Sequence, residues 1–94
     1  MTHDEYVQAC RAAMLREGRR RVAADEEYYR QQGGTTGAWP SSEAERAAHA
    51  RRQAEHEAAL ADYLAEVRAA YEAWTAAGGR YEAWPLGHGV GYTR

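Results

Sequence analysis

Four histidines and one cysteine are the residues of this 94-residue chain with the most obvious capacity for metal binding or nucleophilic attack. His49 and His56 share a helical face, but seven residues of helix place them roughly 10 Å apart along the axis, too far to hold one ion. Glu45 and His49 lie one turn apart and could bind together. The sequence has no Glu-x-x-His pair and no His-Glu-x-x-His motif. We therefore expect no metal and no cofactor.

Nucleophilic and phosphate-binding motifs are equally sparse. Cys10 has no histidine near it in sequence, and no Gly-x-Ser-x-Gly motif is present. As the single cysteine, it cannot form a disulfide within the chain. The glycine-rich run at residues 87–91 follows no predicted strand and opens no helix, as a nucleotide-binding loop would. We expect no catalytic residues and no enzymatic activity.

A cluster of arginines offers one further kind of chemistry, the binding of phosphate groups. Its members lie within eleven residues of each other: Arg11, Arg16, Arg19, Arg20 and Arg21. The surrounding helix is also acidic, and Glu17 can pair with Arg21 one turn later. Because domains that depend on phosphate contacts are usually basic, nucleic-acid binding through Arg11, Arg16, Arg19 and Arg20 is the alternative function rather than the first.

Composition indicates one small folded domain with a thin core. The net charge is -2, and 45% of residues are hydrophobic, but half of these are alanine. Such a chain buries little surface alone, so we expect another protein or a second copy of itself as partner. Lys, Asn, Ile and Phe are absent, which indicates a GC-rich source such as a bacterium or phage, and the gene could belong to a mobile element. No apolar run could cross a membrane and no secretory signal is present, so we expect a cytoplasmic protein.

A long helix is predicted over residues 43–77. A capping box of Ser42 and Glu45 starts it, and Gly78-Gly79 ends it. Large apolar side chains follow the coiled-coil spacing of four and three residues along its second half. This apolar seam consists of Leu60, Leu64, Val67, Tyr71 and Trp74. We expect the seam to face the core, with a neighbouring row of small residues, Ala47, Ala54 and Ala61, allowing close approach of another helix.

An earlier helix is predicted over residues 3–32. Thr2 and Glu5 form its capping box, and Met1 can pack on Tyr6. Its core face is predicted to contain the larger apolar residues Val7, Cys10, Met14, Val22 and Tyr29, with Leu15 at the edge. Gly18 lies on this face and either permits close backbone approach or marks a kink, and we favour a continuous helix.

A buried carboxylate on the first helix would require a partner. Asp25 lies near the predicted apolar face, and Arg21, one turn earlier, is the nearest candidate. The connection at residues 33–41 is short and glycine-rich, which predicts antiparallel neighbouring helices. Trp39 within it is expected to cover the end of the hairpin, or else to be an exposed anchor for a partner.

The tail at residues 78–94 is too aromatic for a solvated linker. It is expected to pack on the helices or on another molecule. Together with Trp39 and the end of the long helix, it supplies the candidate partner-binding residues Trp39, Tyr71, Trp74, Tyr81, Trp84 and Tyr92, since aromatic residues often anchor interfaces.

Two helices joined by a turn that contains an aromatic residue are similar in outline to the secreted helical hairpins with a Trp-x-Gly turn. In this chain Trp39-Pro40-Ser41 stands at the turn, and the tail lacks the Tyr-x-x-x-Asp/Glu signal of that family. The similarity therefore concerns architecture, and no function is carried over from it.

The sequence thus predicts an all-α fold: an antiparallel helical hairpin with one long helix and an aromatic, Gly-rich C-terminal tail packed on it. The expected function is that of a small non-enzymatic protein-protein interaction module, such as a regulator, an inhibitor or an assembly subunit. We expect it to bind its partner through the apolar seam, Trp39 and the aromatic residues of the tail.

Overall fold

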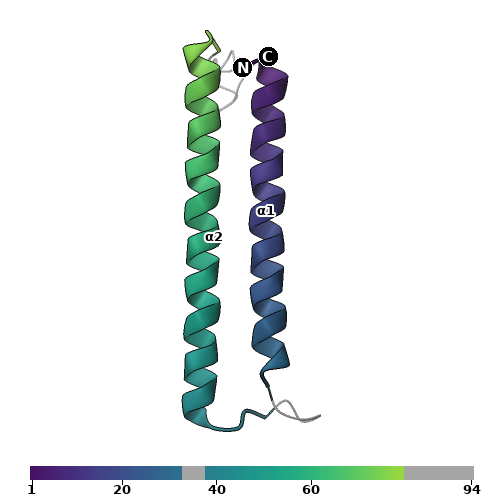
Figure 1. Cartoon of the computed structure of the whole chain (residues 1–94), viewed down its shortest axis with the longest axis vertical. Helices are drawn as coiled ribbons and strands as arrows, with labels where there is room; N and C mark the ends of the chain where they lie inside the picture. Colours follow the sequence, from purple (N-terminus) through teal and green to yellow (C-terminus); the bar gives the residue numbers. More distant parts are fainter. Residues whose placement is uncertain (33–37, 80–94) are drawn as a thin grey trace, which may run out of the picture.

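The computed structural model describes residues 1–32 and 38–79, and these form an antiparallel pair of helices. Helix α1 spans His3–Arg30 and helix α2 spans Ser42–Ala76. They lie side by side along most of their length, with the start of α1 beside the end of α2 (Figure 1). The predicted all-α hairpin is confirmed for the described residues, and α1 continues through Gly18 without a break. Neither helix is long and apolar enough to span a membrane.

Local signals fix the helix ends. The predicted capping box at the start of α1 is present: the Glu5 amide donates to the Thr2 hydroxyl at 3.1 Å and the Thr2 amide donates to the Glu5 carboxylate at 2.7 Å. At α2 the prediction was wrong by one residue. Ser41, not Ser42, is the N-cap, and its hydroxyl accepts from the Ala44 amide at 3.0 Å. Gly78 ends α2 with a φ of 99°, which glycine adopts readily.

Alanine, rather than the large aliphatic residues, forms the middle of the contact between the helices. Ala13 and Ala59 are each only 1% exposed, and Ala48 and Ala70 are also buried. Small side chains let two helix backbones approach closely, which the sequence predicted, but with the wrong row of residues. Ala47, Ala54 and Ala61 are all exposed.

The largest buried side chains lie at the end of the hairpin away from the connection. The rings of Tyr6 and Trp74 stack with their centroids 4.7 Å apart and their planes 7° apart, beside Ala70. Cys10, which belongs to the predicted core face of the first helix, is half-buried against this cluster. The chain then passes so close to the indole of Trp74 that a Cβ on Gly79 would collide with it. Stacked rings of this kind contribute beyond the area that they bury, so this aromatic cluster is the main core of the described part.

At the other end, aromatic and cationic groups cover the start of the connection. The half-buried Trp39 lies with its ring 5.0 Å from the ring of Tyr28. The Arg52 guanidinium carbon lies 4.8 Å from the Tyr28 centroid, within range of a cation–π interaction. This arrangement agrees with the predicted covering role of Trp39.

Candidate interaction surfaces

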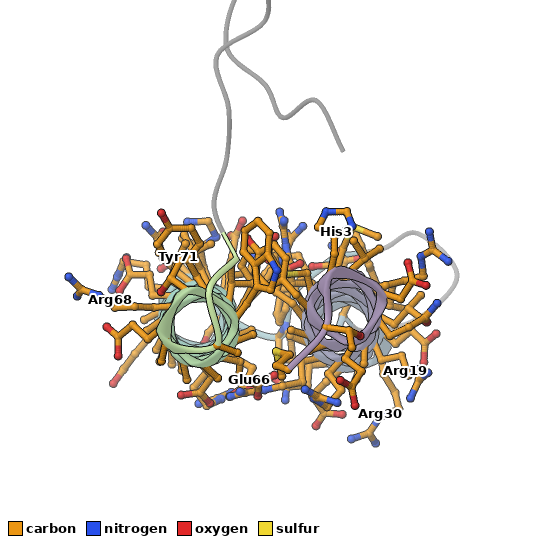
Figure 2. The ribbon with its side chains drawn as sticks, turned by 90° about the horizontal axis from the view of Figure 1, so that it is seen from above. His3, Arg19, Arg30, Glu66, Arg68 and Tyr71 are labelled. Carbon is orange, nitrogen blue, oxygen red and sulfur yellow. The ribbon has the colours of Figure 1, made fainter. Side chains whose placement is uncertain are left out.

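The two flanks of the hairpin differ in chemistry. Seen along the helices, His3 and Tyr71 lie on one flank, whereas Glu66, Arg19 and Arg30 lie on the opposite one (Figure 2). The flank that carries Glu66 is bound together by ion pairs from α1 to α2. The other flank carries exposed apolar side chains of α2, beside the contacts of Asp25 with Arg52 and His56.

On the charged flank, two arginines of α1 hold carboxylates of α2. Arg16 pairs with Glu66, and Arg20 pairs with both Glu55 and Asp62, at 2.9 and 2.5 Å. The hydrogen bonds to the two carboxylates, first that to Asp62, raise the pKa of Arg20. Because these pairs are partly exposed to water, each adds modestly to stability. They join α1 to α2 along this flank.

These ion pairs engage two of the arginines that were predicted to contact nucleic acid. Arg16 and Arg20 are occupied by carboxylates of α2, while Arg11 and Arg19 are exposed and form no ion pair with the described residues. The predicted pairing of Glu17 with Arg21 is present at 3.4 Å. Only half of the four candidate guanidinium groups are therefore available to a phosphate backbone without breaking the interhelix contacts.

The apolar seam of α2 runs along the edge of the contact with α1 instead of through it. Trp74 is buried and Val67 is half-buried, but Leu60 is 47% exposed and Leu64 is 56% exposed. Tyr71 is also exposed, and Leu64 and Leu60, seven and eleven residues before it, project from the same side of α2. The prediction that the whole seam faces the core was therefore wrong. Leu60, Leu64 and Tyr71 form an exposed patch, here called the α2 patch.

Most of the predicted core face of α1 is also turned outward, although Cys10 packs on the aromatic cluster and Val7 is half-buried. Met14, Leu15, Val22 and Tyr29 are all about half exposed, whereas the buried residues of α1 are Tyr6 and Ala13. Met14, Leu15 and Val22 surround a shallow hollow at Gly18 on this outer face. Two separate apolar surfaces thus remain uncovered by the described residues, one on each helix.

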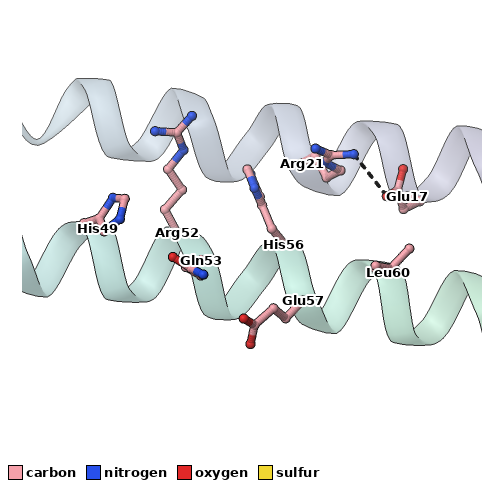
Figure 3. A pocket seen from close by; sticks show the side chains of 8 residues that line it. All are labelled: Glu17, Arg21, His49, Arg52, Gln53, His56, Glu57 and Leu60. Atoms are coloured by element: carbon pink, nitrogen blue, oxygen red, sulfur yellow. Dashed lines mark hydrogen bonds and ion pairs between the residues drawn. The ribbon is translucent and has the colours of Figure 1, made fainter.

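A charged groove lies between the helices next to the α2 patch. It has a volume of about 430 Å³ and includes Glu17, Arg21, His56 and Leu60 among its lining residues (Figure 3). The side chains of Arg52 and His56 reach from α2 toward α1, and Glu57 points away from it (Figure 3).

Asp25 is the centre of the polar contact beside this groove. Its Oδ1 accepts from Arg52 Nε at 2.7 Å and lies 2.9 Å from His56 Nε2. The predicted partner Arg21 was wrong, because α2 presents a guanidinium and an imidazole to the half-buried carboxylate and Arg21 pairs with Glu17 instead. The hydrogen bond from Arg52, above all, lowers the pKa of Asp25, so this carboxylate stays ionised.

The charged side chains around the groove are paired mainly with one another. Asp25 forms an ion pair with Arg52 and a hydrogen bond with His56, and Glu17 forms an ion pair with Arg21. Within residues 1–32 and 38–79, no group of three His, Cys, Asp or Glu side chains is arranged to hold a metal ion. At this groove, the contacts of Asp25 with Arg52 and His56 join α1 to α2.

Three of the six aromatic residues predicted to bind a partner are described. Tyr71 is exposed on the α2 patch, Trp74 is buried in the aromatic cluster, and Trp39 is half-buried against Tyr28. The other three, Tyr81, Trp84 and Tyr92, lie outside the described residues. Leu60 and Leu64, which belong to the seam expected to bind a partner, are exposed on the same side of α2 as Tyr71.

Comparison of the chain with family models, with curated proteins and with solved structures found no match.

Proposed function

We propose that the hairpin is a non-enzymatic protein-protein interaction module that binds another protein through the α2 patch. The observation that carries the proposal is the exposure of Leu60, Leu64 and Tyr71 in one row while alanine fills the interior. Apolar side chains gathered in one exposed surface are typical of protein interaction sites. An amphipathic helix of the partner, laid along this row, would match its spacing of four and seven residues.

The proposed surface is held on a rigid support. The ion pairs on the far flank and the Tyr6–Trp74 stack fix α2 against α1, so the patch does not have to be ordered on binding. A preorganised surface loses less conformational entropy when its partner binds. Complete burial of a leucine side chain stabilises a complex by about 1.5–3 kcal/mol, so the two leucines supply a large share of the affinity.

The aromatic residues of the tail are included in this proposal. The chain leaves α2 at Gly79 in direct contact with Trp74, on the same helix as the α2 patch. We expect Tyr81, Trp84 and Tyr92 to extend the apolar surface from that point, packed on the hairpin. Nucleic-acid binding through the arginines of α1 is the weaker proposal, because Arg16 and Arg20 already pair with carboxylates.

The test compares a double substitution in the α2 patch with a matched one on the opposite side of the same helix. A photoreactive residue at position 64 of the full chain, expressed in its source cells, identifies the partner, which is then purified and titrated. Leu60→Gln with Leu64→Gln should weaken binding by at least tenfold. Ala58→Gln with Ala65→Gln, at exposed positions away from the patch, should leave the affinity within about threefold.

A purified partner that binds the leucine variant as tightly as the unchanged chain would remove the α2 patch as the binding site. Circular dichroism of both double variants is the control for folding, because all four positions are exposed and none of the substitutions should unfold the hairpin.

A further inference from the structure

No contact within residues 1–32 and 38–79 explains the glycine at position 18. It stands in the middle of α1, where glycine costs roughly 1 kcal/mol relative to alanine. A Cβ at this position would meet no atom within 4 Å among the described residues, so no close approach to α2 requires glycine there. The hollow around it has a volume of about 520 Å³ and is bordered by Met14, Leu15 and Val22. The site is therefore open to a molecule from outside.

Apolar residues lie at equal distances before and after Gly18 along the outer face of α1. Met14 lies four residues before it and Val22 four residues after it. Val7 lies eleven residues before it and Tyr29 eleven residues after it. Offsets of four and eleven residues keep these side chains on one face of a helix. The stripe is thus apolar at equal distances from a central glycine.

The charges on the same face are opposite in sign at the mirror positions. Arg11 lies seven residues before Gly18, and Asp25 and Glu26 lie seven and eight residues after it. Asp25 is already engaged by α2. Arg11 and Glu26 are both exposed and form no ion pair with the part of the chain that the structure describes.

From this pattern we infer that a second copy of the chain docks on the outer face of α1, antiparallel to it, with the two-fold axis at Gly18. A two-fold axis brings each residue before the centre against its mirror position in the partner. Met14 then packs on the partner's Val22, Val7 packs on the partner's Tyr29, and Arg11 pairs with the partner's Glu26. The two glycines meet at the crossing point, where the absence of Cβ atoms lets the backbones approach closely.

The area of the apolar stripe on α1 determines how tightly the two copies are expected to bind. The 28 residues of α1 extend for about 42 Å, and a helix face about 12 Å wide gives roughly 500 Å² per copy. The total of about 1,000 Å² is at the lower end for a specific interface. We therefore expect a dimer with a dissociation constant in the micromolar range. This surface is separate from the α2 patch, so a dimer leaves Leu60 and Leu64 free for another protein.

The test is sedimentation equilibrium of the full chain across a range of protein concentrations, with charge reversal as the diagnostic. Arg11→Glu and Glu26→Arg should each weaken the dimer about tenfold, because symmetry places two such pairs in it and each exposed pair is worth up to about 1 kcal/mol. The double variant Arg11→Glu with Glu26→Arg should restore the dimer to within about threefold. Gly18→Leu should abolish the dimer while α1 remains helical.

A chain that stays monomeric at all concentrations would overturn the inference, as would a dimer that tolerates Gly18→Leu or is not rescued by the double reversal. Ala47→Leu, at an exposed position on α2, is the control for added bulk and should leave the dimer unchanged. If Leu60→Gln with Leu64→Gln dissociates the dimer, self-association uses the α2 patch, and the inference about α1 is wrong. Loss of the α1 dimer, conversely, leaves the proposed binding of another protein intact.

Discussion

Enlarging a single alanine tests whether the helices really meet through their smallest side chains. Ala59 is 1% exposed at the contact of α2 with α1. In Ala59→Leu the larger side chain has no space, so the helices must separate or the side chain must leave its preferred rotamer, at a cost of about 1–3 kcal/mol. Leucine and alanine differ little in helix propensity, so the change in packing should dominate the change in the free energy of unfolding.

The matched control is Ala61→Leu, two residues further along the same helix at an exposed position. It should change the free energy of unfolding by no more than about 0.5 kcal/mol. Urea unfolding followed by far-ultraviolet circular dichroism measures both variants, at two protein concentrations so that association does not mask the difference. If Ala61→Leu were the more destabilising of the two, the helices would pack through the row of alanines that the sequence predicted, and the orientation of α2 described above would be wrong.

Two further substitutions probe the end of α2 and the polar contact. Gly79→Ala should destabilise the hairpin by about 1–3 kcal/mol in urea unfolding, because its Cβ would collide with the Trp74 indole; an unchanged midpoint would mean that Gly79 does not pack there. Asp25→Asn should lower stability at neutral pH, since Arg52 stabilises the ionised carboxylate and lowers the pKa of Asp25. That contribution is present above the pKa of Asp25 in the unfolded chain, about 4, and is lost as the pH falls through the lower folded value. The stability difference between the unchanged chain and Asp25→Asn, measured as a function of pH, should therefore shrink below about pH 4, and a difference that stays constant there would contradict this role.

Local signals in the sequence were sufficient to predict both helices and to place their ends within two residues. Capping residues and terminal glycines act over three or four neighbours, so the Thr2–Glu5 box and the stop at Gly78 were predictable from the chain alone. The prediction of antiparallel neighbours followed from the short connection between two long helical patterns.

The orientation of each helix was not predictable in the same way. Large apolar residues usually mark the core, and that rule pointed to Leu60 and Leu64. In the structure the facing positions of α2 are Ala48, Ala59 and Ala70, eleven residues apart, together with the polar Arg52 and His56. Alanine is so common along this helix that these three do not mark one face. The energetics of the contact depend on partners from the other helix, such as the carboxylate of Asp25, and the sequence of one helix does not contain that information.

The location of the aromatic cluster has a consequence for the order in which the molecule folds. Tyr6 and Trp74 are separated by nearly the whole described chain, so their stack closes a long loop and should form late. Asp25 and Arg52 are much nearer in sequence and lie toward the connection. The hairpin is therefore expected to form its interhelix contacts first near the connection and last at the opposite end. The contact between Asp25 and Arg52 would align the helices early, and the stacked rings of Tyr6 and Trp74 would form after the register of the helices is set.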